Sequence, residues 1–165
     1  MAYDSLIDSI DDRLQVAGIL IGRINEAPWI DEFESHLPQR LPPSFASLVR
    51  RYAFRPFEWG RMRFFGNSGT DDELDLAVGT VGDSAISRTT AVAGLIHFAR
   101  PAGFSYDPIC FDTRTRGKSR ESPIVRLDHE AVLIKSRIDV LEQVAPSFSA
   151  LLESLRASHK DPIGE

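Results

Sequence analysis

The middle of this chain carries six short, β-prone segments rich in aromatic residues, and they limit its fold more than any other feature. The segments span 54–59, 61–65, 74–78, 93–99, 108–112 and 122–127. Turn residues, chiefly glycine, separate nearly all of them, which is typical of strands in a sheet. Because these strands follow one another without helical crossovers, we expect them to pair mainly antiparallel.

Helical patterns flank this region on both sides. Before it, apolar residues recur at helical spacing in three stretches, 6–14, 30–37 and 45–52. After it, one apolar helical face is formed by Phe148, Leu151, Leu152 and Leu155. The sequence therefore predicts an α+β fold with a mainly antiparallel sheet of about five to six strands, helices at the N-terminal side, and one C-terminal helix packing on the sheet.

Length and composition predict one domain with its own core. The chain has 165 residues and is 42% hydrophobic, so we assign residues 1–160 to a single domain and 161–165 to a frayed tail. The single cysteine, Cys110, excludes a disulfide within the chain. The first residues lack the pattern of a signal peptide, and no apolar run is long enough to span a membrane. A cytoplasmic location without membrane contact is expected.

Charge favours a protein partner over nucleic acid. The formal net charge is -5, whereas phosphate contacts need clustered lysine and arginine. Acidic blocks are usually solvated faces, but they also steer the approach of a basic protein. Two acidic groups, one in a predicted loop and one on a predicted helix face, are the candidate partner contacts: Asp71, Asp72, Glu73 and Asp75, and Asp11 and Asp12.

Common signatures of nucleotide, zinc and hydrolase sites are absent from the sequence. No catalytic residue, cofactor or metal ligand is predicted. The best enzymatic hypothesis gathers acids and an imidazole at strand ends, where they could bind a divalent metal or act in acid and base chemistry: Asp107, Asp112, Asp128, His129 and Glu130. A metal-dependent hydrolase built on Asp112, Asp128 and His129 is therefore an alternative.

The structural interpretation of these residues is favoured over the enzymatic one. Strand-terminal aspartates commonly accept hydrogen bonds from loop backbone groups. Residues 128–130 are consecutive, so in an extended segment His129 would point away from its neighbours. Cys110 lies in an apolar run, where burial disfavours the thiolate that a nucleophile needs.

Two further groups of residues each allow a structural and a functional interpretation. Aromatic residues at 52–65 alternate with arginines, which favours a buried core with an arginine-bearing outer face over a platform for stacking bases. The arginine-rich stretch 114–120 also contains glycine and serine, which favours a mobile surface loop over an anion-binding site.

The order of several motifs resembles the SUKH superfamily, the Syd and Smi/Knr-like domains. The resemblance covers about residues 26–156 and rests on three blocks. These blocks are Phe33 and Glu34 with Leu41-Pro42-Pro43-Ser44-Phe45, Leu48 and Tyr52; Ile96-His97-Phe98-Ala99 with Gly103, Asp107 and Ile109-Cys110-Phe111-Asp112; and Pro123-Ile124-Val125, Asp128-His129-Glu130 and Ser147-Phe148-Ser149-Ala150-Leu151-Leu152. The chain departs from the family in having 103–108 where a Gly-Gly-Asp turn is frequent, and 53–55 where an asparagine-glycine pair is frequent.

This resemblance implies a domain without catalysis that binds other proteins. In bacteria such domains serve chiefly as immunity proteins that bind and neutralise a cognate polymorphic or contact-dependent toxin, and related eukaryotic domains serve in signalling. The expected partner is a toxin domain, for example a basic nuclease. A regulatory scaffold is the alternative that the resemblance leaves open, and the sequence does not determine the oligomeric state.

Overall fold

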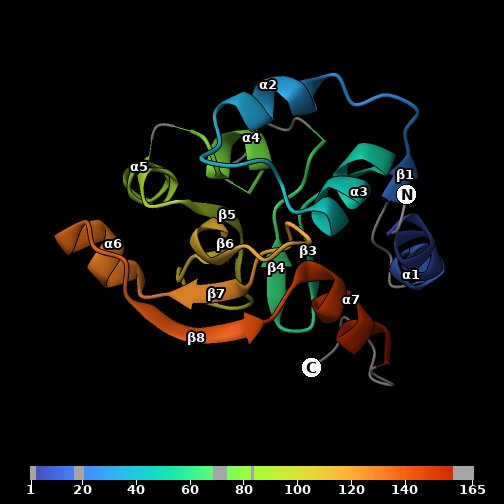
Figure 1. The fold of residues 1–165 in the computed structure, drawn as a ribbon. Helices are drawn as coiled ribbons and strands as arrows, with labels where there is room; N and C mark the ends of the chain where they lie inside the picture. Colours follow the sequence, from blue (N-terminus) through green and yellow to red (C-terminus); the bar gives the residue numbers. More distant parts are fainter. Residues whose placement is uncertain (1–2, 17–20, 69–73, 83, 158–165) are drawn as a thin grey trace.

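The structure is a computed structural model that describes residues 3–16, 21–68, 74–82 and 84–157. Over these residues the chain has an α+β fold with a six-stranded and a two-stranded sheet (Figure 1). The helices are α1 (Asp4–Val16), α2 (Trp29–Ser35), α3 (Pro43–Arg51), α4 (Leu76–Gly79), α5 (Ala85–Val92), α6 (His129–Lys135) and α7 (Phe148–Ala157), with a short 3-10 helix, η1, at Thr113–Thr115. The strands are β1 (Ile21–Arg23), β2 (Tyr52–Phe54), β3 (Phe57–Trp59), β4 (Met62–Phe64), β5 (Leu95–Pro101), β6 (Ile109–Asp112), β7 (Ile124–Leu127) and β8 (Val140–Ala145).

The larger sheet confirms the predicted antiparallel arrangement. Its strands lie in the order β3-β4-β5-β6-β7-β8, and each pairs antiparallel with the next one along the chain. Antiparallel neighbours need no crossover connection. Consecutive strands therefore stay adjacent in the sheet even where a helix lies between them along the chain. β3 and β8 form the two edges of the sheet, and β1 and β2 form the separate two-stranded sheet.

The larger hydrophobic core joins α3 and α7 to one face of the sheet. Four buried phenylalanines form its centre, one from each helix and one each from β5 and β6. The ring centroid of Phe45 lies 5.0 Å from that of Phe111 and 5.1 Å from that of Phe148, and Phe98 stacks on Phe111 at 4.0 Å. The C-terminal helix therefore packs on the sheet as predicted, through the apolar face that includes Phe148.

A smaller core covers the other face of the sheet with α5 and α6. Its buried members are Leu95, Cys110, Val125, Leu127 and Val132. Successive side chains of a strand point to opposite faces, so Ile109 and Phe111 enter the larger core while Cys110 between them enters the smaller one. The sheet is thus buried on both faces at its centre.

The predicted N-terminal helices form where their start signals lie. Pro43 occupies the first turn of α3, where a missing backbone N–H costs nothing, and the helix buries Phe45, Leu48 and Val49. Tyr52 ends this helix and begins β2. The predicted segment 54–59 is divided between β2 and β3, because Arg55 and Pro56 lie between the two strands.

One predicted strand is wrong, and several elements are new. Residues 74–78 contain the start of helix α4 instead of a strand, because the Asp75 side chain accepts a hydrogen bond from the backbone N–H of Ala77 and caps the helix. Helices α5 and α6 and strands β1 and β8 have no counterpart in the sequence-based interpretation. β8 is exposed along most of its length, so its sequence carries little hydrophobic alternation.

Among the described residues, no helix combines the length and the apolar composition that crossing a bilayer requires. The predicted tail, 161–165, lies outside the described residues.

Candidate functional site

Strand β6 has an aspartate at each end, and the two lie in different surroundings. Asp107 lies two residues before the strand, and Asp112 is its last residue. β6 and β7 are antiparallel with Ile109 opposite Arg126, so Asp107 lies at the end of the sheet where β7 ends and α6 begins. Asp112 lies at the opposite end of β6.

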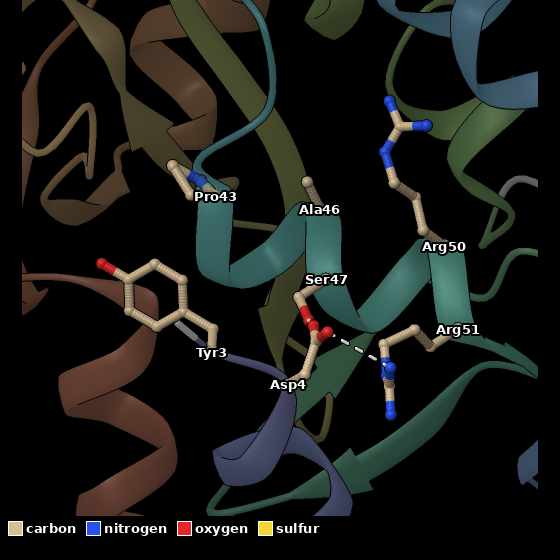
Figure 2. A pocket seen from close by; sticks show the side chains of 7 residues that line it. All are labelled: Tyr3, Asp4, Pro43, Ala46, Ser47, Arg50 and Arg51. Carbon is tan, nitrogen blue, oxygen red and sulfur yellow. Dashed lines mark hydrogen bonds and ion pairs between the residues drawn. The ribbon is translucent and has the colours of Figure 1, made fainter. Parts of the chain in front are cut away.

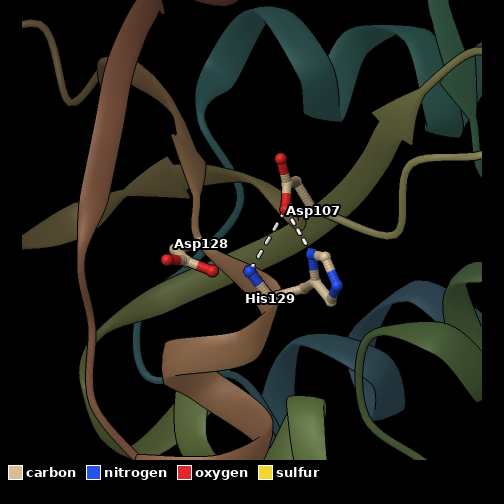
Figure 3. A group of neighbouring side chains, drawn as sticks. All are labelled: Asp107, Asp128 and His129. Atoms are coloured by element: carbon tan, nitrogen blue, oxygen red, sulfur yellow. Dashed lines mark hydrogen bonds and ion pairs between the residues drawn. The ribbon is translucent and has the colours of Figure 1, made fainter.

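Asp107 binds two side chains from the β7–α6 junction, as Figure 3 shows in part. Arg126 Nε donates to Asp107 Oδ2 at 2.8 Å, and His129 Nδ1 lies 2.6 Å from Oδ1. The backbone N–H of His129 also donates to Oδ1, at 3.2 Å. An ionised carboxylate only accepts, so Nδ1 carries the proton in this contact. We call Asp107, Arg126 and His129 the Asp107 clamp.

The clamp keeps the Asp107 carboxylate charged although it is buried. Burial by itself raises the pKa of Asp107, but the hydrogen bonds from His129 and Arg126 together outweigh this and leave the pKa below its ordinary value. The Asp107 side chain is 8% exposed, whereas those of Arg126 and His129 are about one-third exposed. The carboxylate is therefore an internal anchor for two partly solvated cationic or donor groups.

The alternative interpretation is that part of this cluster binds a metal ion. Asp107, Asp128 and His129 each offer one ligand atom, and these atoms lie within 4.8 Å of one another. Both oxygens of Asp107 already accept hydrogen bonds, and the Asp128 side chain accepts from the backbone N–H groups of Glu130 and Ala131 at the start of α6. A divalent cation would have to displace the Arg126 guanidinium, which lies 2.7 Å from Asp107. The contacts favour a structural clamp over a metal centre.

The structure brings together only part of the predicted set of five. Asp112 is at the far end of β6, where it accepts hydrogen bonds from the backbone and side chain of Arg114. Glu130 is exposed on the surface of α6. The prediction for His129 is wrong, because 129 begins a helix and its ring turns back to Asp107 instead of pointing away along an extended segment. The expectation that strand-end acids cap backbone groups is confirmed at Asp112 and Asp128.

Two buried titratable groups lie in the middle of the sheet, opposite each other in β5 and β6. Cys110 is fully buried, as predicted, and this burial, with a smaller effect of Asp112, raises the pKa of its thiol well above the ordinary value and disfavours the thiolate. Burial also lowers the pKa of His97 to about 4. The His97 ring contacts Phe65 edge to face, with centroids 4.7 Å apart. Both groups are part of the packed interior.

The aromatic residues of the region 52–65 form core, as predicted. The buried members are Tyr52, Phe54, Phe57, Trp59, Phe64 and Phe65. On the opposite face of β4, Arg63 donates to Glu58 of β3. The arginine-rich stretch lies mostly at the surface, as predicted, and within it Arg116 donates to the Ser122 hydroxyl at 2.8 Å and to the carbonyl of Arg40.

The predicted partner-contact acids fall into three groups. Asp71, Asp72 and Glu73 lie outside the described residues. Asp11 and Asp12 lie in α1, as predicted, and their side chains are outside the described part of the structure. Asp75 is only 2% exposed and caps α4, so its predicted position on an exposed loop is wrong.

A pocket of about 390 Å³ lies beside one stripe of side chains on α3 (Figure 2). The stripe has helical spacing and consists of Pro43, Ala46, Ser47 and Arg50. Tyr3 and Asp4 form the facing side, and Asp4 accepts from the Ser47 hydroxyl at 2.5 Å. Arg50 and Arg51 at the rim pair with carboxylates, Arg50 with Glu34 at 2.8 Å and Arg51 with Asp8 at 2.6 Å. The pocket therefore presents a mostly apolar surface with a neutralised rim.

Sequence reasoning missed Arg126 as the partner of Asp107. The signal available was the position of both residues at the ends of two strands that are consecutive along the chain, because consecutive antiparallel strands place such residues side by side.

No protein-family model matches this sequence, and no curated protein matches it either.

Proposed function

We propose that this chain is a non-catalytic protein-binding domain that protects a bacterial cell by binding and neutralising a cognate toxin. The resemblance of its motifs to the SUKH superfamily motivates the proposal. The observation that carries the non-catalytic part is the engagement of the strand-end groups: Asp107 is held by Arg126 and His129, and Asp112 by Arg114. A carboxylate that acts as a general base or metal ligand needs a lone pair that its substrate or ion can reach. The oxygens of Asp107 and Asp112 already accept hydrogen bonds from groups within the chain.

Affinity capture followed by a growth assay tests the proposal. The tagged protein is used to capture partners from a lysate of its own organism, and each captured domain is then expressed in a test strain with and without this chain. We expect one stoichiometric partner that arrests growth alone and becomes harmless on co-expression. Capture of several housekeeping proteins without toxicity would favour the regulatory scaffold instead.

The acidic residues outside the described region belong to this proposal as steering groups. Reversing one charge, Glu73→Lys, should slow association with a basic toxin and flatten the dependence of its rate on salt, because complementary charge between two proteins acts mainly on the encounter rate. The matched control is Glu153→Lys on the exposed surface of α7. Equal association rates for the two variants would remove Glu73 from the contact surface.

The metal-dependent hydrolase is the second candidate, and the cluster of Asp107, Asp128 and His129 is the observation in its favour. Titration calorimetry with zinc, manganese and magnesium separates the two functions. A binding domain should give no saturable heat at micromolar metal. A site that saturates there, and that is lost in Asp128→Asn, would support the hydrolase.

A further inference from the structure

The loop between β5 and β6 holds two aromatic side chains in solvent. Phe104 is fully exposed, at 101% of its reference area, and Tyr106 is 60% exposed. Phenylalanine is among the residues most often buried, and most of the phenylalanines in this chain lie in the core. Gly103, with a φ of 92°, provides the turn that projects the next residue away from the sheet. The backbone conformation of the loop therefore places the Phe104 side chain in solvent.

This loop is anchored on both sides. On one side, Asp107 is held by the clamp, and the backbone N–H of Leu127 donates to the carbonyl of Pro108 at 2.8 Å. On the other side, the backbone N–H of Ala102 donates to the carbonyl of Arg61 at 2.9 Å. The aromatic side chains thus project from a segment whose ends are fixed. A fixed segment loses less conformational freedom when it binds a partner, which favours affinity.

Positive charge accompanies the two aromatic rings. The Arg100 guanidinium lies 5.4 Å from the centroid of the Tyr106 ring, a cation–π arrangement. Arg61 is exposed in the turn between β3 and β4, and within the described ranges no ion pair involves it. The neighbouring Arg63 is different, because Glu58 neutralises it. Arg61 therefore adds positive charge beside the loop.

We propose that residues Arg61, Arg100, Phe104 and Tyr106 form a docking surface for an acidic segment of another protein. Phe104 enters an apolar site of the partner, and carboxylates of the partner face Arg61. Aromatic residues and arginine are enriched at the centres of protein interfaces, and complementary charge aligns the partners. This surface is distinct from the acidic residues proposed to steer a toxin, and it does not rest on the toxin function.

Protein fits this surface better than single-stranded nucleic acid does. A nucleic-acid surface needs a continuous basic track, whereas the chain has a net charge of -5, and Arg63 and Arg126 nearby are paired with acids. Val140 and Leu141, each about half exposed, lie at the same end of the sheet, since Val140 pairs with Leu127. Aliphatic side chains extend an apolar protein contact but are poor surfaces for stacking bases.

Random peptides displayed on phage test the proposal without knowledge of the natural partner. The full chain is used to select peptides, and the selected sequences are synthesised and titrated against variants. We expect selected peptides to combine acidic with apolar residues. Phe104→Ser should weaken their binding about tenfold or more, and Arg61→Ser should weaken it by a smaller factor and reduce its salt dependence.

Val92→Ser is the matched control, because Val92 is 90% exposed on α5, away from the loop. It should leave peptide binding unchanged. Equal binding to wild type and Phe104→Ser would overturn the proposal, as would the absence of selected peptides or of acidic residues in them. Loss of binding in Val92→Ser alone would move the docking site to α5. Tight binding of a labelled oligothymidylate that is lost in Phe104→Ser would assign the surface to nucleic acid.

Discussion

The two aspartates that flank β6 are equally buried but differ in the distance over which they act. Asp107 and Asp112 are each 6% exposed. Asp107 binds side chains 19 and 22 residues later in the chain, in β7 and α6. Asp112 binds Arg114, two residues away, and caps the short η1 turn. Burial alone therefore does not reveal whether an acid supports tertiary or local structure, since the separation of its partners along the chain decides it.

Replacing each aspartate by asparagine tests this difference between Asp107 and Asp112 most directly. Asp107→Asn should lower the free energy of unfolding by about 3 kcal/mol, because it removes a buried charge that pairs with Arg126 and accepts hydrogen bonds from His129. Both partners are about one-third exposed, so water limits the loss to the lower end of the range for broken buried pairs. Urea unfolding measures the change.

The same variant should also loosen the β5–β6 loop. Hydrogen exchange of the backbone amides at 103–107 should quicken in Asp107→Asn and stay unchanged in Asp112→Asn. A loss of stability below about 1 kcal/mol in Asp107→Asn would show that solvent screens the clamp as it screens a surface ion pair.

Acid titration distinguishes Asp107, near one end of β6, from the buried His97 at the middle of the sheet, because these groups titrate in different pH ranges. His97 faces Cys110 across β5 and β6. Its pKa is about 4 in the folded protein and 6.5 when unperturbed, so the unfolded chain binds the proton more tightly and stability falls as pH drops from 6.5 to 4. From about pH 7 to about pH 5 the expected loss is about 2 kcal/mol.

His97→Leu is the control that removes this step. The ring nitrogens of His97 lack well-formed hydrogen bonds to described residues, so an apolar side chain should be tolerated at neutral pH. The Asp107 contribution is lost in a lower pH range: its pKa is lowered on folding, so its stabilisation is complete above the unfolded pKa and is lost as pH falls through the folded value. An unchanged pH profile in His97→Leu would assign the acid step to other groups.

The smallest expected effect is that of Asp112→Asn. Asparagine retains an oxygen that accepts from the backbone N–H of Arg114, so only the ion pair with the half-exposed Arg114 side chain is lost. We expect a loss of about 1 kcal/mol or less in the free energy of unfolding, again by urea titration. A loss as large as that of Asp107→Asn would contradict the distinction between a local and a tertiary role.

The candidate site was predictable in its residue types but not in its grouping. Sequence reasoning selected Asp107, Asp128 and His129 because acids and an imidazole follow strand patterns, and the structure places these three close together. It also included Asp112, which lies at the other end of β6. The separation of these residues follows from strand direction and register, which a list of residue types does not contain.

The exposure of acidic residues was harder to predict. Asp75 looks like part of an exposed acidic run in the sequence, yet it is buried as the cap of α4. Capping depends on a single hydrogen bond to a backbone N–H, and that bond exists only once the following helix has formed. Phe104 shows the reverse: its place after Gly103, between two predicted strands, indicates a turn, but only the loop backbone shows that the side chain is fully exposed.

Periodicity and turn residues are local features, and they were enough to predict the α+β class, the antiparallel sheet, the N-terminal and C-terminal helices and the buried aromatic core. The contacts of Asp107 with Arg126 and His129, the burial of Asp75 and the place of β8 at the edge of the sheet emerge only in the folded chain. Those outcomes depend on which strands are neighbours and in what register, and such contacts join residues too far apart along the chain for a local pattern to specify them.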